Sequence, residues 1–220
     1  MKIRNLIIII CLIIFASCNE QKNHNPIVGD KKVFDTVIKD IPLNKNGKPY
    51  GYYRNKPNVE NKLGLSTLEK GFDSLQIRLW YGYSSNDRSQ LVILKNNNQE
   101  WSAELFTLEY QFDSNTDTIT SISKSSIIRE PASGWSNFSR RLFDLQIMTL
   151  PDEDKIRDYP DLMDGNGIIV ELATRKLYRV YSYKEPNYIY NRKKIKEAYN
   201  MESILNLIEQ EFNFKRLKKI

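Results

Sequence analysis

Residues 72–83, FDSLQIRLWYGY, decide the fold of this chain. Apolar side chains alternate in this stretch with Gln, Arg and Trp, which is the period-2 pattern of a β-strand with one buried face. The alternating apolar positions are Leu75, Ile77, Leu79 and Tyr81. The polar turn SSNDRS follows directly, so the pattern predicts a strand that ends in a tight connection to a second strand.

Further strands and two helices complete the predicted domain. The segments QLVILK, WSAELFTLEYQF and TITSISKSSII are separated by short polar turns, which favours an antiparallel meander. Residues 168–183 predict a hairpin that turns at residues 174–175. Apolar residues at helical spacing predict helices over 135–149, with Ser136 as the N-cap, and over 194–211. The sequence therefore predicts an α+β fold with a mainly antiparallel β-sheet and two helices packed on it.

The start of the chain has the layout of a signal for export. Lys2 and Arg4 precede an apolar run at residues 6–15. This run is far shorter than the roughly 20 residues that a helix needs to cross a bilayer. A basic start, a short apolar core and small residues after it are typical of a secretory signal peptide.

Cys18 follows two small residues at the end of this apolar run. The arrangement resembles the lipobox of bacterial lipoproteins, although Phe15 stands where that pattern has an aliphatic residue. The resemblance implies that residues 1–17 are a signal peptide and that Cys18 carries the lipid. Residues 18–30 would then be the lipidated cysteine and a flexible tether.

Residues 31–220 are predicted to form one globular domain, with 31–70 as an irregular part rich in proline and turn residues. The chain has 2 cysteines, both before this domain, and its 1 histidine, His24, lies in the tether. Without a thiol or an imidazole, the domain cannot hold a cysteine nucleophile, a thiolate metal site or a Ser-His-Asp triad. We therefore expect no catalytic residues, no cofactor and no enzymatic activity.

Three segments, DSLQIRLWYGY, EWSAELFTLEY and DGNGIIVELATRKLYRVYSYKEPN, together resemble a group of lipoproteins from the Bacteroidota whose function is unknown. The resemblance covers residues 71–187 and rests on the spacing of these segments. It implies a location in the cell envelope, and it implies no activity.

Two charged residues are predicted within apolar strand faces. Glu104 shares its face with Phe106 and Leu108, and Arg179 shares its face with Tyr181. Such residues could form a polar site that grips a ligand. The favoured alternatives are a structural ion pair or, for the glutamate, a position at a strand edge near water, because a buried charge without a partner is strongly destabilising.

Tyr183, Tyr188 and Tyr190 flank the sequence KEPN and are expected to be exposed. Exposed tyrosines form flat, amphipathic surfaces that suit a sugar ring or a partner protein. Most of the other strand aromatics are expected in the core. These three tyrosines are therefore the predicted partner surface.

Asp164, Asn166 and Glu171 supply oxygen atoms of the kind that bind calcium. Their spacing does not match an EF-hand loop, and Asn-Gly favours a tight turn, so we predict a turn and no metal site. The acidic run at residues 152–154 is likewise predicted to be solvated at a helix end. Adjacent loop residues rarely keep the separation that paired catalytic carboxylates require.

These observations favour a non-enzymatic binding or accessory module that is held in the cell envelope by the N-terminal lipid. Asn19, rather than an aspartate, follows Cys18, which by analogy with enteric bacteria favours the outer membrane. The net charge of +6 is expected to reflect a solvated surface, and nucleic acid is not an expected partner of an exported protein. The membrane and either another envelope protein or a glycan are the expected partners.

Two alternatives remain. One is a carboxylate-based or calcium-dependent hydrolase of envelope polymers that uses Glu104, Asp164 or Glu171. The other is an immunity or assembly protein that binds another protein.

Overall fold

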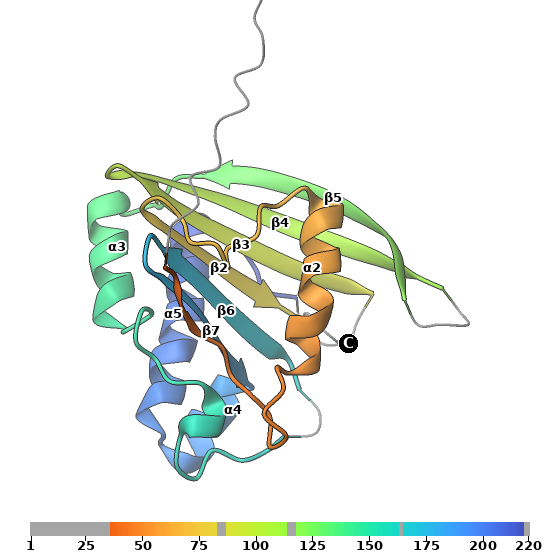
Figure 1. Ribbon diagram of the computed structural model, residues 1–220. Helices are drawn as coiled ribbons and strands as arrows, with labels where there is room; N and C mark the ends of the chain where they lie inside the picture. The colour runs from red at the N-terminus through yellow and green to blue at the C-terminus, as the bar shows by residue number, and fades with distance from the viewer. Residues whose placement is uncertain (1–35, 83–86, 114–117, 163–164, 218–220) are drawn as a thin grey trace, which may run out of the picture. The chain divides into compact units, whose positions relative to one another are not determined.

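The computed structural model describes residues 36–82, 87–113, 118–162 and 165–217. These residues contain a seven-stranded, mainly antiparallel sheet and four α-helices, which confirms the predicted α+β class (Figure 1). The strands are β1 (Ile38–Asp40), β2 (Leu75–Tyr81), β3 (Arg88–Asn97), β4 (Glu100–Phe112), β5 (Ile119–Arg129), β6 (Gly167–Thr174) and β7 (Leu177–Lys184). Their order across the sheet is β1-β7-β6-β2-β3-β4-β5. Cys18 and the other residues of the predicted leader and tether lie outside the described residues.

The predicted meander is present, since β2, β3, β4 and β5 pair antiparallel in sequence order. The predicted hairpin of β6 and β7 joins the sheet beside β2, where Leu75 lies opposite Thr174. The short strand β1 pairs parallel with β7, with Ile38 opposite Leu177. These last two pairings link segments that are far apart in the chain.

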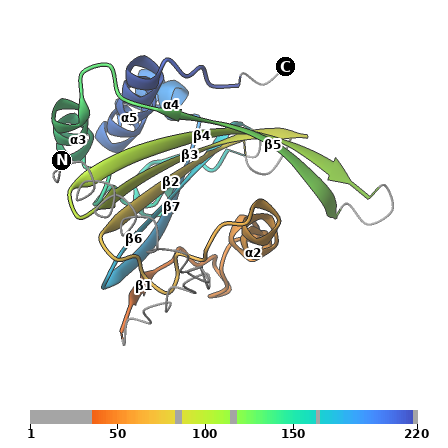
Figure 2. The same cartoon turned by 90° about the horizontal axis from the view of Figure 1, so that it is seen from above.

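Helices cover both faces of the sheet. Helices α3 (Trp135–Asp144), α4 (Pro186–Lys193) and α5 (Lys196–Phe212) lie on one face, and α2 (Gly51–Leu63) lies on the other (Figure 2). The alternation in β2 therefore sends Ile77, Leu79 and Tyr81 into the core beneath α5 and Trp80 into the core beneath α2. The expectation of a strand with one buried face was wrong, because the second face of β2 is also covered.

Helix α2 lies in the segment that was predicted to be irregular, and it contains Pro57. Its end is closed by Gly64, whose positive φ of 72° lets the backbone turn back on the helix. The N–H groups of Gly64 and Leu65 donate to the carbonyls of Asn61 and Glu60, which are otherwise unpaired at a helix end. This capping motif, together with burial of the helix face, stabilises α2 despite the proline.

The other helices also depart from the prediction in detail. Helix α3 begins after Gly134 rather than after Ser136, and it ends at Asp144, where the chain enters a turn. Helix α4 was not predicted, and it begins at Pro186, a residue type that suits the first helical position. Helix α5 confirms the predicted C-terminal helix.

One edge of the sheet is closed by acidic side chains. Beyond the short strand β1, the N–H groups of Ser182 and Lys184 in β7 donate to the carboxylates of Asp152 (2.9 Å) and Glu153 (2.6 Å). The expectation that this acidic run is solvated was therefore wrong for these two residues. Their carboxylates accept hydrogen bonds from backbone N–H groups that would otherwise be unpaired at the sheet edge.

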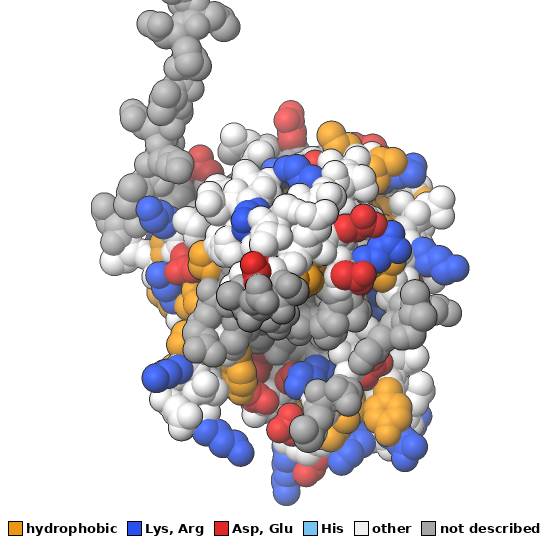
Figure 3. All heavy atoms as spheres, turned by 90° about the vertical axis from the view of Figure 1, so that its right-hand side faces the viewer, with side chains coloured by type: hydrophobic (Ala, Val, Ile, Leu, Met, Phe, Trp, Pro, Cys, Tyr) orange, Lys and Arg blue, Asp and Glu red, His pale blue; other side chains and the backbone are white. Residues whose placement is uncertain are grey.

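The surface carries mixed charges. On the face shown in Figure 3, acidic and basic side chains are interspersed. Some opposite charges of the protein surface form exposed ion pairs, such as Arg88–Glu109 and Arg175–Asp73. Pairs of this kind contribute little to stability, and they are consistent with a solvated surface.

Glu153 predicts a specific pH dependence of stability. Burial raises the pKa of its carboxyl to about 7 from an ordinary value of 4.5, although the Lys184 N–H acts in the opposite direction. The folded state therefore binds this proton more tightly than the unfolded state, and the Glu153 contribution to stability falls as the pH rises from about 4.5 to 7. Glu153→Gln, which can still accept the bond, should gain stability relative to the unmodified protein between pH 5 and pH 8.

Urea unfolding at four pH values would measure this difference. Glu100→Gln, which changes an exposed carboxylate at the start of β4, is the matched control. If the free energy of unfolding depended on pH in the same way in Glu153→Gln and in the unmodified protein, the proposed pH-dependent contribution of Glu153 would be contradicted.

Candidate functional site

Glu104 and Arg179 lie on opposite faces of the sheet and do not form a common site. Glu104 shares its strand face with Phe106, which packs in the core beneath α2, and Arg179 shares its face with Tyr181, which packs in the core beneath α5. Glu104 is half-buried, and among the described residues none bonds to its carboxylate. Its predicted cation partner is therefore not found in the described chain.

Arg179 has a structural role that its position in β7 explains. Its Nε donates to Asp40 of β1 (2.8 Å), and its two Nη atoms donate to the carbonyls of Met148 and Leu150. Burial alone would raise the pKa of Asp40, but the hydrogen bonds from Arg179 and Lys155 outweigh burial and lower it. Arg179 thus ties β1 and the loop after α3 to β7, as the ion-pair alternative predicted.

The three tyrosines of the predicted partner surface are not equivalent. Tyr183 is 0% exposed, and its hydroxyl donates to the carbonyl of Pro151 (2.8 Å), so the expectation that it is exposed was wrong. Its position in β7 points it into the core beneath α5. Tyr188 is exposed on α4 with Arg192 over its ring (5.2 Å), and Tyr190 is half-buried on the same helix.

The weak calcium candidates are also separated. Asp164 lies outside the described residues. Asn166 precedes β6, whereas Glu171 lies five residues further along this extended strand, which is about 16 Å away. In the described part of the chain, no group of three His, Cys, Asp or Glu side chains could hold a metal ion.

Glu171 belongs instead to a buried charge cluster, which consists of Lys56, Glu60, Arg78 and Glu171. These residues come from α2, β2 and β6, and each is at most 3% exposed. The Nζ of Lys56 lies 2.7 Å from Glu171 and 3.4 Å from Glu60. Arg78 pairs with Glu60 and donates to the carbonyl of Ser66 (2.7 Å).

Neutral donors complete the bonding of Glu171. Trp80 Nε1 donates to one carboxylate oxygen (2.8 Å) and the Tyr178 hydroxyl donates to the other (2.7 Å). Burial alone would raise the pKa of Glu171, but the charges of Lys56 and Arg78 outweigh burial and lower it. Burial raises the pKa of Glu60, and the charge of Glu171 adds to this rise.

The buried charge cluster cannot act on a substrate in this arrangement, because its charged groups face one another and are closed to solvent. Two negative and two positive side chains balance within it. Removing one member would leave an unpaired buried charge. The cluster therefore fixes α2 on the sheet.

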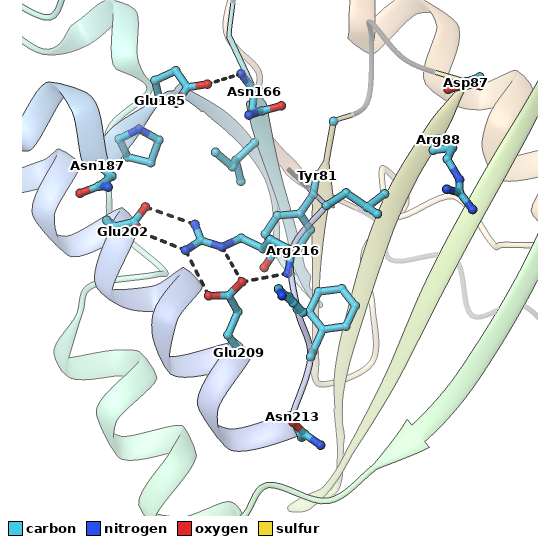
Figure 4. Close-up of a pocket in the computed structure, with 17 residues that line it drawn as sticks. Tyr81, Asp87, Arg88, Asn166, Glu185, Asn187, Glu202, Glu209, Asn213 and Arg216 are labelled. Carbon is cyan, nitrogen blue, oxygen red and sulfur yellow. Dashed lines mark hydrogen bonds and ion pairs between the residues drawn. The ribbon is translucent and has the colours of Figure 1, made fainter. Parts of the chain in front are cut away.

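A second group of polar residues lines a cavity of about 790 Å³, which we call the C-terminal cavity (Figure 4). It lies where β2 ends and β3 and β6 begin, beside the first turn of α4, the side of α5 and the chain after α5. Six separate segments of sequence thus contribute to it. This size falls in the range of small-molecule sites.

Arg216 is held at this cavity by two carboxylates of α5. Its guanidinium lies 2.9 Å from Glu202 and 3.0 Å from Glu209, and it also donates to Asn206 (2.9 Å). Burial alone would lower the pKa of Arg216, but the bonds to Glu202 and Glu209 outweigh burial and raise it. Gln90 fixes the same segment by accepting from the N–H of Leu217 (2.9 Å).

Tyr81 forms the inner wall of the C-terminal cavity. Its ring lies 6.0 Å from the ring of Phe214, and Figure 4 shows it next to Arg216. Its hydroxyl is closed to water and has no hydrogen-bond partner among the described residues. Burial raises the pKa of Tyr81, so this hydroxyl stays neutral at ordinary pH.

Sequence reasoning did not identify the C-terminal cavity. One signal was present, because Glu202 and Glu209 are seven residues apart on α5 and therefore lie on one helix face. Tyr81 was expected only as a core residue, and Arg216 lies in a basic C-terminal segment without a recognisable motif.

No protein-family model, curated protein or solved structure matches this chain. Among the described residues, no helix combines the length and the apolar character that a membrane crossing requires.

Lys56 offers a direct test of the buried charge cluster. Lys56→Met should lower the free energy of unfolding by about 3 kcal/mol or more, because it leaves Glu171 buried without its closest cation. Lys39→Met removes an exposed lysine that pairs with Glu69 at 3.2 Å, and it should cost only about 0–1 kcal/mol. Urea unfolding monitored by tryptophan fluorescence measures both values, and equal losses in the two variants would refute the structural role of the cluster.

Proposed function

We propose that the protein is a lipid-anchored, non-enzymatic binding module of the bacterial cell envelope. Its C-terminal cavity would hold a small, neutral, hydroxyl-rich ligand such as a glycan fragment. The observation that carries this proposal is the C-terminal cavity of about 790 Å³, whose lining combines asparagine amides and ion-paired charges with apolar side chains. The lipobox-like sequence at Cys18 supports the location, with the outer membrane as the proposed site of attachment.

The charges of the C-terminal cavity favour a neutral ligand. Its described lining contains four acidic and three basic side chains. Arg216 is occupied by Glu202 and Glu209, so it offers little to an anion. For the same reason a cationic ligand would have to compete with Arg216 for both carboxylates.

The remaining lining groups suit hydroxyl groups. Asn166, Asn187 and Asn213 carry amides that both donate and accept hydrogen bonds. Phe214 adds an apolar surface of the kind that packs against the C–H face of a sugar ring. The arrangement supports binding rather than hydrolysis, because Glu202 and Glu209 are engaged with a cation and neither is placed as a free acid or base.

Asn187 tests the proposal, because it is exposed and lines the C-terminal cavity at the start of α4. Asn187→Phe removes one amide and adds bulk, so affinity for the ligand should fall on the order of tenfold. Asn58→Phe is the matched control, since Asn58 is exposed on α2 and lies outside the cavity lining. That variant should retain the affinity.

Calorimetric titration of the full lipidated chain in a sugar-free detergent would measure binding of glucose, N-acetylglucosamine and chitobiose. Spermidine and inorganic phosphate would represent cationic and anionic ligands. The expected result is that a neutral sugar binds, that Asn187→Phe weakens this binding and that Asn58→Phe retains it. Absence of binding by every probe, or equal binding by both variants, would overturn the proposal.

A further inference from the structure

The two edges of the sheet differ in how their backbone groups are covered. At one edge, β1 pairs with β7, and Asp152 and Glu153 accept the next free N–H groups of β7. At the other edge, β5 is the last strand in the sheet order and pairs only with β4. In the part of the chain that the structure describes, no strand lies on the outer side of β5.

The outer side of β5, which we call the β5 edge, has the properties of a pairing surface. It is 11 residues long and contains no proline, and its one irregularity in pairing lies at its start, opposite the end of β4. Four serines keep its side chains short, and Ile127 and Ile128 are 47% and 74% exposed. A long exposed edge with unpaired N–H and C=O groups is a template for another strand.

We propose that the β5 edge binds an extended segment of a partner protein that adds an eighth strand to the sheet. The charges of β5 define the chemistry of this segment. Lys124 and Arg129 are the only charged residues of β5. The ammonium of Lys124 donates to the carbonyl of Leu63 at the end of α2 (2.7 Å), and Lys62 of α2 donates to the carbonyl of Thr120 (3.0 Å). A lysine ammonium has three donors, so the bond to Leu63 leaves two of them for a carboxylate. Opposite charges that lie across from each other stabilise paired strands, so the segment carries a carboxylate opposite Lys124.

The spacing along β5 defines the rest of the segment. Ile127 and Ile128 lie three and four residues after Lys124, and they point to opposite faces of the sheet. In an antiparallel partner strand, two apolar residues therefore precede the carboxylate by three and four positions. This pattern fits the addition of a strand to a sheet edge, in which the main chain provides affinity and alternate side chains provide specificity.

A second copy of this chain fits the β5 edge less well. Lys124 is the central residue of β5, so a symmetric antiparallel pair with full overlap places Lys124 opposite Lys124 of the other copy. Like charges in this position are destabilising. The charge pattern thus favours an acidic partner strand over self-association.

A labelled synthetic peptide tests the proposal in the full lipidated chain in detergent micelles. The peptide has two Val, then two Thr, then Glu, with Thr at both ends, and a control peptide has Lys in place of Glu. Fluorescence anisotropy should show binding of the Glu peptide about threefold tighter than the Lys peptide. Lys124→Glu should reverse this preference, and Lys124→Gln, which removes the charge but keeps a donor for the Leu63 carbonyl, should remove it. Ile128→Lys should weaken both peptides.

Lys176→Glu is the matched control, because it makes the same charge change in the exposed turn between β6 and β7 and should leave the preference unchanged. Absence of binding by either peptide, or a preference that Lys124→Glu does not alter, would overturn the proposal. Light scattering provides a second readout. A concentration-dependent dimer that Ile128→Lys abolishes would assign the β5 edge to a second copy and would also overturn the proposal.

Discussion

The contact between Lys56 and Glu171 determines where helix α2 lies, and the second face of the sheet depends on it. A charge taken from water is strongly destabilising until a partner and hydrogen bonds replace the solvent. Glu171 lies in the middle of β6, and the cations that balance it come from α2 and β2. A different position or orientation of α2 would leave charges unpaired. Apolar contacts alone would allow several positions of the helix. Once α2 is placed, Trp80 and Phe106 on the same face are buried.

The local parts of this fold could be predicted from the sequence, because alternation and short turns act over a few residues. The strands β2 to β5 and the hairpin of β6 and β7 follow from such patterns. The joining of β6 to β2 and the parallel pairing of β1 could not be predicted, because they depend on contacts across the chain. Helix α2 was missed because the prolines of this segment, Pro57 among them, and its turn residues argued against a helix. The burial of Lys56 and Glu60 on this helix is a tertiary effect that local propensity does not contain.

The candidate site was less predictable than the fold, for the same reason. The C-terminal cavity takes residues from six segments, and none of them carries a motif. Arg216 lies near the end of a basic stretch that looks solvated, yet Glu202 and Glu209 hold its guanidinium on α5. The residues that looked suggestive in the sequence have mostly structural roles. Arg179 fastens β1 to β7, and Glu171 balances the buried charge cluster.

The covering of the sheet explains why its two edges differ. Helices on one face and α2 on the other bury β2, β3, β6 and much of β4, but they leave most of β5 exposed. Burial therefore contributes little to the stability of β5. Its order depends on pairing with β4 along almost its full length and on two bonds to α2, from Lys62 to the carbonyl of Thr120 and from Lys124 to the carbonyl of Leu63. A strand held in this way keeps one side of its backbone available in an extended conformation. A partner strand that binds there would bury the exposed Ile127 and Ile128 without the entropic cost of ordering β5, which favours binding at this edge over binding to an irregular loop.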